Sequence, residues 1–257
     1  RLSSRDPNLQ NIPTRTDIGH AIRRAFVPAK GNVFVSADYS QFELRLAACM
    51  AGDENMVKDF NEDLDVHATT AAQVQGVPLD KVDKEMRRRA KAVNFGILYG
   101  MSPHGLSIAT GMTIIEAKEF IDKYFELRKP LKDYMIHTAD MALKQGYVET
   151  MFGRRRPTPD MKSSNFMVRE GARRAAINMP IQGTEADLMK LAMLKVETEL
   201  GDLGKQILQI HDSILVECPK ANAEKVRQIL KDCMENIYEL PVKLKVDVKV
   251  GANWGEL

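Results

Sequence analysis

The clearest hydrophobic pattern in the chain lies at residues 33–48, which read VFVSADYSQFELRLAA. The segment opens as an apolar run rich in β-branched and aromatic residues, which is typical of a buried strand, and the run stops at Asp38. From Gln41 onward the apolar residues recur at spacings that a helix can use, so the strand is predicted to lead into a helix. A carboxylate at the tip of a buried strand is costly unless it is compensated, and a divalent cation is a common compensation. The alternative is an Asp that only caps the following helix.

Beyond Gly52 the periodicity becomes helical, and strands return near the end of the chain. Helices are predicted at 53–75, 80–99, 113–128, 130–145, 164–199, where Pro180 marks a point of interruption, and 221–238. Strands are predicted at 206–210, 213–217 and 244–250, and hairpins at 25–37 and 146–156. A helical insert between strand-rich ends requires sheet elements that are far apart in sequence to come together. This pattern predicts a fold that mixes helices with a sheet.

Composition narrows the class of protein only a little. The 257 residues carry 37 Lys+Arg and 35 Asp+Glu, so the net charge of +2 does not by itself indicate a nucleic-acid partner. The three cysteines are far apart and show no metal-ligand spacing, which favours structural thiols in a reducing compartment. No apolar run approaches membrane-spanning length, so no membrane association is expected. The chain begins at Arg1 inside a motif-like segment, and we expect it to be a piece of a longer protein.

Residues 1–24 are polar and predicted to be irregular, because Pro7 and Pro13 exclude one continuous helix. Their amide and guanidinium side chains are donors that suit phosphates and the edges of nucleic-acid grooves. An ordinary solvated loop is the alternative.

A second motif, RRRAKAVNFGILYG, places two cations and two aromatic rings four residues apart, as Arg87, Lys91, Phe95 and Tyr99. On a helix these four residues line one stripe. The cations could hold a polyphosphate and the rings could stack on a base. The alternative is that the rings are core and the cations a solvated face. Gly96 and Gly100 favour the first interpretation, because glycines in a helix cost stability and indicate close approach by a ligand or a neighbouring backbone.

A third motif, QIHDSILVE, has two apolar strand-like runs around His211 and Asp212, which predicts a tight hairpin with an acid at its tip. If the sheet aligns the two strand ends, Asp38 and Asp212 could share two metal ions. Such a pair of ions activates an attacking oxygen and stabilises a leaving one in phosphoryl transfer.

With these motifs in hand, nearly the whole chain resembles the family A DNA polymerases, the bacterial DNA polymerase I type. DYSQFELR resembles motif A of that family, RRRAKAVNFGILYG its motif B, and QIHDSILVE its motif C. The segments RLSSRDPNLQNIP and NMPIQGTEADLMK are also similar to family segments. The resemblance implies an α+β fold. Its palm, an antiparallel sheet with packed helices, would be formed by residues 1–60 and 166–257, and its mostly helical fingers by residues 61–165.

The resemblance also implies roles for individual residues. Two Mg²⁺ ions, for which Mn²⁺ can substitute, would be held by Asp38, Asp212 and the backbone carbonyl of Tyr39. Lys91 would donate a proton to the pyrophosphate, and Glu43 would exclude a ribose 2′-hydroxyl. The residues implied to bind the nucleotide are Tyr39, Gln41, Glu43, His67, Arg87, Lys91, Phe95 and Tyr99. The residues implied to contact DNA are Arg1, Asn8, Gln10, Asn11, Arg15, Arg174, Asn178, Gln182 and His211.

The expected reaction is template-dependent transfer of a deoxynucleotide to a primer 3′-hydroxyl, with release of pyrophosphate. The expected partners are primer-template DNA and deoxynucleoside triphosphates. The protein is expected to be a monomer in the cytoplasm, nucleoid-associated in bacteria, or a phage or organelle equivalent. Two alternatives stay open, a single-subunit RNA polymerase relative, against which Glu43 argues, and a catalytically silent nucleic-acid-binding module.

The chain departs from the family pattern in three places. Ser213 stands where the family usually has Glu, which removes a third carboxylate. Phe42 stands at a usually aliphatic position beside the nucleotide pocket, so substrate selectivity is in question. The segments that would form the thumb and N-terminal domains are absent from this sequence, and we therefore expect this piece alone to bind primer-template weakly and to extend it poorly.

Overall fold

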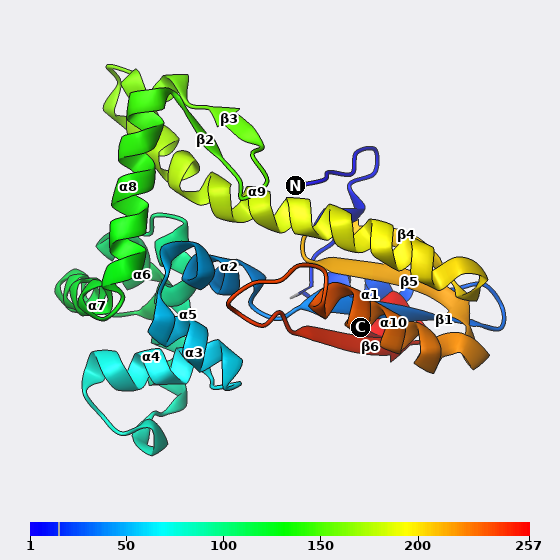
Figure 1. The fold of residues 1–257 in the computed structure, drawn as a ribbon. Coiled ribbons are helices and arrows are strands. Elements are labelled where there is room, and N and C mark those ends of the chain that lie inside the picture. The colour runs from blue at the N-terminus through cyan, green and yellow to red at the C-terminus, as the bar shows by residue number, and fades with distance from the viewer. Residues whose placement is uncertain (15) are drawn as a thin grey trace. The chain divides into compact units, whose positions relative to one another are not determined.

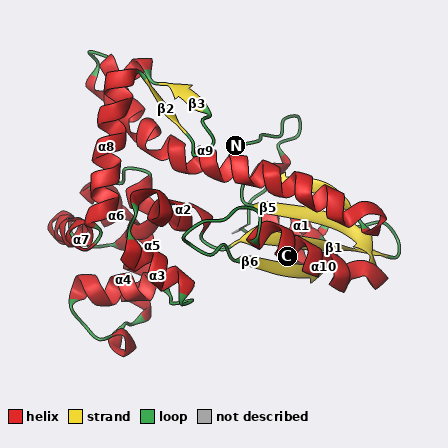
Figure 2. Ribbon diagram, viewed as in Figure 1, coloured by secondary structure: helices red, strands yellow, loops and turns green. Residues whose placement is uncertain are grey.

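The computed structural model describes residues 1–14 and 16–257, which form two compact units (Figures 1 and 2). Unit 1 consists of Arg1–Phe42, Glu185–Glu239 and Leu244–Leu257, and unit 2 of Glu43–Thr184 and Leu240–Lys243. The predicted division into palm and fingers at residues 60 and 165 stays a prediction. Among the described residues, no helix has both the length and the apolar character needed to cross a membrane.

Unit 1 is built on a four-stranded antiparallel sheet with the order β4-β5-β1-β6. The strands are β1 (Asn32–Tyr39), β4 (Lys205–Ile210), β5 (Ser213–Pro219) and β6 (Val246–Gly251). The first strand along the chain is thus central, between two strands that follow it by more than 170 residues. This arrangement confirms the prediction that distant sheet elements come together.

The two faces of β1 have different environments because side chains alternate along a strand. Val35, Ala37 and Tyr39 are buried, and the Tyr39 hydroxyl donates to the carbonyl of Met234 in α10 (Ala223–Glu235) at 2.7 Å. The helix α10 therefore covers this face. Ser36 and Asp38 project from the opposite face of the sheet, which carries the candidate site.

Unit 2 is mainly helical. Its helices are α2 (Phe42–Ala51, of which Phe42 belongs to unit 1), α3 (Glu54–Asn61), α4 (Val66–Gln75), α5 (Lys84–Leu98), α6 (Pro103–Thr110), α7 (Ile114–Leu127) and α8 (Lys129–Gln145). A two-stranded sheet of β2 (Tyr147–Glu149) and β3 (Arg155–Pro157) confirms the hairpin predicted at 146–156. The long helix α9 (Phe166–Leu200) contributes residues to both units.

Three predicted elements are wrong in detail. The hairpin predicted at 25–37 does not form, because β1 already has β5 and β6 as its two neighbours. The helix predicted at 53–75 is two helices, since Asp53 caps α3 and Asp65 caps α4. The segment predicted to be irregular contains α1 (Asp17–Arg24), which Thr16 caps by accepting from the N–H of Gly19.

Two further differences concern helices. The sequence prediction missed α6, which starts with a Ser102 cap and ends at Gly111 in the left-handed conformation. The interruption expected at Pro180 is absent, and α9 runs through this residue. Buried Ile177 and Ile181 lie on both sides of Pro180, and their packing outweighs the lost backbone hydrogen bond.

Candidate functional site

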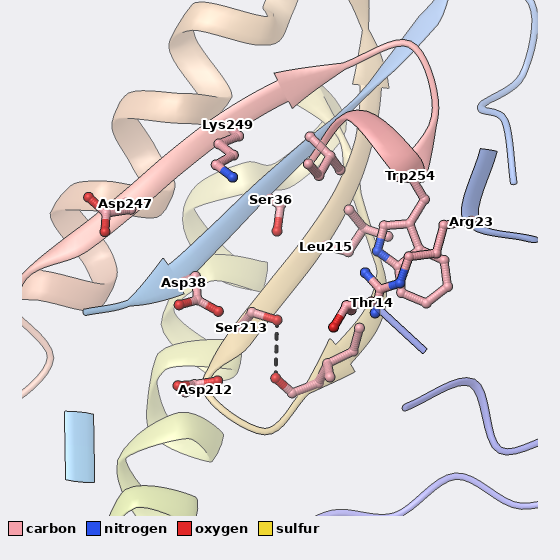
Figure 3. A pocket seen from close by; sticks show the side chains of 12 residues that line it. Thr14, Arg23, Ser36, Asp38, Asp212, Ser213, Leu215, Asp247, Lys249 and Trp254 are labelled. Atoms are coloured by element: carbon pink, nitrogen blue, oxygen red, sulfur yellow. Dashed lines mark hydrogen bonds between the residues drawn. The ribbon is translucent and has the colours of Figure 1, made fainter. Parts of the chain in front are cut away.

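The two predicted carboxylates lie at the ends of adjacent strands of the sheet in unit 1 (Figure 3). Asp38 is next to the last residue of β1, and Asp212 occupies the turn between β4 and β5. The N–H of Tyr39 donates to the backbone carbonyl of Asp212 at 3.0 Å, which fixes the turn beside the end of β1. The tight hairpin predicted around His211 and Asp212 is present, and His211 adopts a positive φ of 52° in it.

A third carboxylate, which the sequence reasoning missed, joins them. Asp247 pairs directly with Asp38 across β1 and β6, so the two side chains project from the same face. The signal was available in the sequence KVDVKV, where Asp247 and Lys249 alternate with valines. The three aspartates line one cavity of about 390 Å³, together with Ser36, Ser213 and Lys249 and with Thr14, Arg23, Ile210, Leu215, Trp254 and Leu257.

The electrostatics of Asp38 suit a site for a cation. Its side chain reaches solvent, yet protein atoms crowd the carboxylate. This crowding, followed by the negative charges of Asp212 and Asp247, raises the pKa of Asp38 to about 7, while the charge of Lys249 acts in the opposite direction. A divalent cation with oxygen ligands would relieve this repulsion, and carboxylates are the donors that Mg²⁺ accepts. The described residues contain no ready-made group of three or more His, Cys, Asp or Glu that could hold a metal.

The hairpin that carries Asp212 is held by hydrogen bonds around its turn. The Ser213 hydroxyl donates to the carbonyl of Ile210 at 3.1 Å (Figure 3), and the Gln209 amide donates to the carbonyl of His211 at 2.6 Å. Gln10 from the N-terminal segment donates to the carbonyl of Gln209 at 2.9 Å. These bonds place the predicted DNA-contact residues Gln10 and His211 in one neighbourhood.

Asn8 and Arg1, two other predicted DNA contacts in unit 1, have structural partners of their own. Asn8 caps the short 3₁₀ helix Leu9–Asn11 by accepting from the N–H of Gln10. Arg1 forms an ion pair with Glu185 at 3.3 Å. Arg15 lies outside the described residues.

The connection from β1 to α2 runs from Tyr39 through Gln41 to Phe42, and these residues belong to unit 1. The rings of Tyr39 and Phe42 stack with centroids 4.0 Å apart, and both side chains are buried. Gln41 has a positive φ of 54°, and its buried side-chain carbonyl has no hydrogen-bond partner among the described residues. A buried acceptor without a partner is costly, so Gln41 is suited to accept a hydrogen bond from a ligand.

In unit 2, α5 carries the predicted cation stripe. Arg87 and Lys91 are exposed, and the guanidinium of Arg87 pairs with Asp65 at 2.6 Å. This ion pair contributes to a lowered pKa of the Asp65 carboxyl, against the effect of desolvation. A phosphate that binds Arg87 would compete with Asp65. Lys91 forms no hydrogen bond or ion pair with any described residue.

His67 and Phe95 lie side by side on α4 and α5, with ring centroids 5.6 Å apart. Desolvation, with the nearby charges of Arg87 and Lys91, outweighs Asp65 and lowers the pKa of His67 to about 4. Asn94 lies 3.0 Å from Nδ1 of His67. The ring is therefore neutral at physiological pH, and His67 is 2% exposed.

Tyr99 follows the last residue of α5 and is tied to Glu43, the predicted selector against ribonucleotides. The hydroxyl of Tyr99 donates to the carboxylate of Glu43, which is 8% exposed. Gln182 from α9 donates to the same carboxylate at 3.1 Å and to the Tyr99 hydroxyl at 3.2 Å. The structure thus brings together three residues that the sequence analysis had assigned to nucleotide and DNA binding.

The close approach expected at Gly96 and Gly100 involves side chains rather than backbone. A Cβ at Gly96 would lie 2.4 Å from the side chain of Met101, and one at Gly100 would lie 2.6 Å from that of Arg174. Gly100 is also beyond the end of α5, where its φ of +69° suits glycine. Asn178 donates to the carbonyl of Leu98 at 3.3 Å and so caps the same helix end.

Unit 1 carries a cavity lined by carboxylates, and unit 2 carries a stripe of cations and aromatic rings. Comparison with known proteins identifies the family. Residues 1–256 match the family model for DNA polymerase family A. The chain therefore belongs to DNA polymerase family A.

The relatives give the same result. The chain is 49% identical over 255 residues to the thermostable DNA polymerase I of Thermus aquaticus, covering 99% of this chain and 31% of the relative. It is 48% identical over 255 residues to DNA polymerase I of Deinococcus radiodurans, covering 99% of this chain and 27% of the relative. It thus spans between about a quarter and a third of the length of these relatives.

A solved structure also matches the fold. The POL domain of Pol1 from M. smegmatis, in a complex with DNA primer-template and dNTP, has a TM-score of 0.93 and 41% sequence identity. The match covers all of this chain and 46% of that chain. This match and the antiparallel sheet confirm the predicted α+β fold.

Proposed function

We propose that the protein is a DNA-directed DNA polymerase that adds deoxynucleotides to a primer 3′-hydroxyl and releases pyrophosphate. The observation that carries the proposal is the convergence of Asp38 and Asp212 on one cavity at the sheet ends, in a chain that belongs to DNA polymerase family A. The solved relative was bound to primer-template and dNTP, which supports the same partners here.

Asp38 and Asp212 would hold two Mg²⁺ ions, with the carbonyl of Tyr39 as a further ligand. When bound, the ions supply activation of the attacking hydroxyl and stabilisation of the charge on the leaving group. The protein contributes carboxylates that are fixed by the β1 register and by the hydrogen bond between Tyr39 and the turn of Asp212. Preorganised charge of this kind needs little rearrangement during the reaction.

The stripe of α5 would bind the incoming nucleotide. Arg87 and Lys91 would hold its phosphates, with His67 as a neutral hydrogen-bond donor, and Lys91 would protonate the pyrophosphate. Phe95 would pack on the sugar and base, and Tyr99 would occupy the insertion position. Glu43 would exclude a 2′-hydroxyl and so select deoxynucleotides, and Gln41 would support this selection.

The DNA contacts follow the same reasoning. Asn8, Asn11 and Arg15 from the N-terminal segment and Arg174 and Asn178 from α9 would contact primer and template through sugars and groove edges. Arg1, Gln10, Gln182 and His211 would do the same. The side chains of Arg1, Gln10, Asn178 and Gln182 donate hydrogen bonds to protein groups in this structure, which orients them before DNA binds.

Primer extension tests the proposal. The protein is mixed with primer-template, Mg²⁺ and deoxynucleotides, and it is compared with Asp212→Asn and with Asp202→Asn, which changes an exposed aspartate of unit 1 outside the cavity. We expect extension by the wild type and by Asp202→Asn, and none by Asp212→Asn. Equal binding of DNA without extension by all three proteins would favour the silent module. Extension that prefers ribonucleotides would favour the RNA polymerase relative.

A further inference from the structure

The cavity beside Asp38 contains a cation that the proposed chemistry does not use. Lys249 pairs with Ser36 across β6 and β1, and Asp247 pairs with Asp38, so all four side chains project from one face of the sheet. Figure 3 shows Lys249 near Ser36 on the same side of the sheet as Asp38 and Asp247. A cation is therefore built into the face that carries the carboxylates.

Lys249 is available to a ligand. Its side chain is exposed, and it forms no hydrogen bond or ion pair with any of the described residues. Its charge nevertheless acts on Asp38, where it partly offsets the effect of the other two aspartates. Lys249 is thus close enough to influence the catalytic end of the cavity, but it is not bound to any carboxylate there.

The other cation in the cavity wall is fixed in place. The guanidinium of Arg23 lies 4.4 Å from the centre of the Trp254 ring and donates to the carbonyl of Ile12 at 3.3 Å. Of the described residues that line the cavity, Arg23 and Lys249 are the cations, and only Lys249 is free of protein partners. Leu215 and Trp254 supply apolar surface near them.

We propose that Lys249 binds the phosphodiester that joins the last two nucleotides of the primer, and so positions the primer terminus. The inference rests on the proposed function, because that function places the primer 3′-hydroxyl at Asp38 and Asp212. The phosphodiester of the same nucleotide is one sugar away from that hydroxyl. The pair of Ser36 and Lys249 is two residues along the sheet from the pair of Asp38 and Asp247, a spacing of about 7 Å. One nucleotide can bridge such a spacing.

A phosphodiester matches the single free cation that the cavity offers at Lys249. Asp38 and Asp212 would be neutralised by the proposed Mg²⁺ ions, and away from them the cavity offers one cation without a protein partner, Lys249. A phosphodiester carries one negative charge and needs one cation. The apolar surface of Leu215 suits the sugar that lies between the phosphate and the reactive hydroxyl.

The salt dependence of DNA binding tests the inference. The affinity for primer-template is measured over a range of salt concentrations for wild type, Lys249→Ala, Lys249→Arg and Lys231→Ala, an exposed lysine on the helix that covers the opposite face. Each phosphate contact contributes about 0.9 to the slope of log K against log salt. We expect Lys249→Ala to lower the slope by about this amount and to weaken binding by about fivefold. Lys249→Arg and Lys231→Ala should behave as the wild type.

A modified primer locates the contact. A methylphosphonate at the terminal linkage removes the charge of that phosphate alone. We expect it to raise the KM for primer about fivefold in the wild type, with little change in kcat, and to have no further effect in Lys249→Ala. Independent, multiplying effects of the two changes would overturn the inference.

The remaining outcomes separate the inference from the proposed function. If Lys249→Ala has normal DNA affinity but an altered Mg²⁺ requirement, Lys249 acts as a counter-ion for the aspartates. This result would overturn the proposed phosphate contact. If the wild type extends the primer and Lys249→Ala matches it in DNA binding and in extension, the inference is overturned but the proposed function stands. Failure of the wild type to bind or extend primer would overturn the proposed function and the inference with it.

Discussion

The buried arginine of unit 2 provides the most direct test of what holds the helical unit together. The side chain of Arg128, at the end of α7, is 2% exposed, and it pairs with Asp53 at 3.5 Å and with Asp59 at 3.4 Å. It also donates to the side chain of Gln73 at 3.4 Å. Arg128 therefore links the start of α3, the body of α3 and α4, which packs against α5 and its cation stripe.

Replacing Arg128 by Met keeps the apolar stem and removes the charge. Asp53 is then left as a buried carboxylate whose remaining bond is from the N–H of Met56 at 3.0 Å, while its second oxygen has no hydrogen-bond partner. Breaking a buried ion pair on one side costs about 3–5 kcal/mol. Asp59 is partly solvated, and Asp53 keeps its hydrogen bond from the N–H of Met56. We therefore expect the free energy of unfolding to fall by about 3 kcal/mol, near the lower end of this range.

The free energy of unfolding is measured by urea titration with far-UV circular dichroism, which reports on the helical unit. The double variant Arg128→Met with Asp53→Asn no longer has the uncompensated charge of Asp53. We expect its free energy of unfolding to be about 1–2 kcal/mol higher than that of Arg128→Met alone. Arg227→Met removes an exposed ion pair with Glu224 and should change stability by less than about 1 kcal/mol. A loss in Arg128→Met no larger than that of Arg227→Met would refute the reasoning, as would simple additivity in the double variant.

Three further predictions concern the site. Glu43→Ala should lower the preference for deoxynucleotides over ribonucleotides by about tenfold or more, measured by competitive incorporation, whereas an unchanged preference would remove Glu43 from the selection. The raised pKa of Asp38 means that the native state binds its proton more tightly than the unfolded chain. Without divalent cations, the contribution of Asp38 to the free energy of unfolding should therefore fall as pH rises from about 4 to about 7. In urea titrations, the free energy of unfolding of Asp38→Asn should fall less over this pH range than that of the wild type. Equal pH slopes in the two proteins would contradict the assignment. His67 should stay neutral between about pH 5 and 8, as followed by NMR of its ring protons, and a titration near its ordinary pKa would show that the ring is more solvated than in this structure.

The sequence predicted the strands and helices that have strong periodicity, and it missed those set by tertiary contacts. The pattern of residues 33–48 and the acid at the tip of QIHDSILVE were enough to place two carboxylates at strand ends. The pairing of β1 with β5 and β6 was not predictable from local pattern, because partner choice depends on residues more than 170 positions away. This is why the hairpin at 25–37 was wrong.

The candidate site shows the same limit. Asp247 and Lys249 become part of the cavity only through their register with Asp38 and Ser36, so the strand that carries them was predicted but their place at the site was not. The tie between Tyr99 and Glu43 joins residues 56 positions apart, and its existence depends on the packing of α2, α5 and α9. The roles of these residues in nucleotide selection stay predictions until they are tested.

The central claim is that Asp38 and Asp212 act together in nucleotidyl transfer, and the rate of a single incorporation tests it most directly. Single-turnover rates are measured at saturating Mg²⁺ and deoxynucleotide for the wild type, Asp38→Asn, Asp212→Asn and the double variant. Residues that act as a unit show strongly non-additive effects. We expect each single variant to lose about a thousandfold or more, and the double variant to be no more than about tenfold slower than either. Single variants within tenfold of the wild type, or losses that multiply in the double variant, would contradict the account.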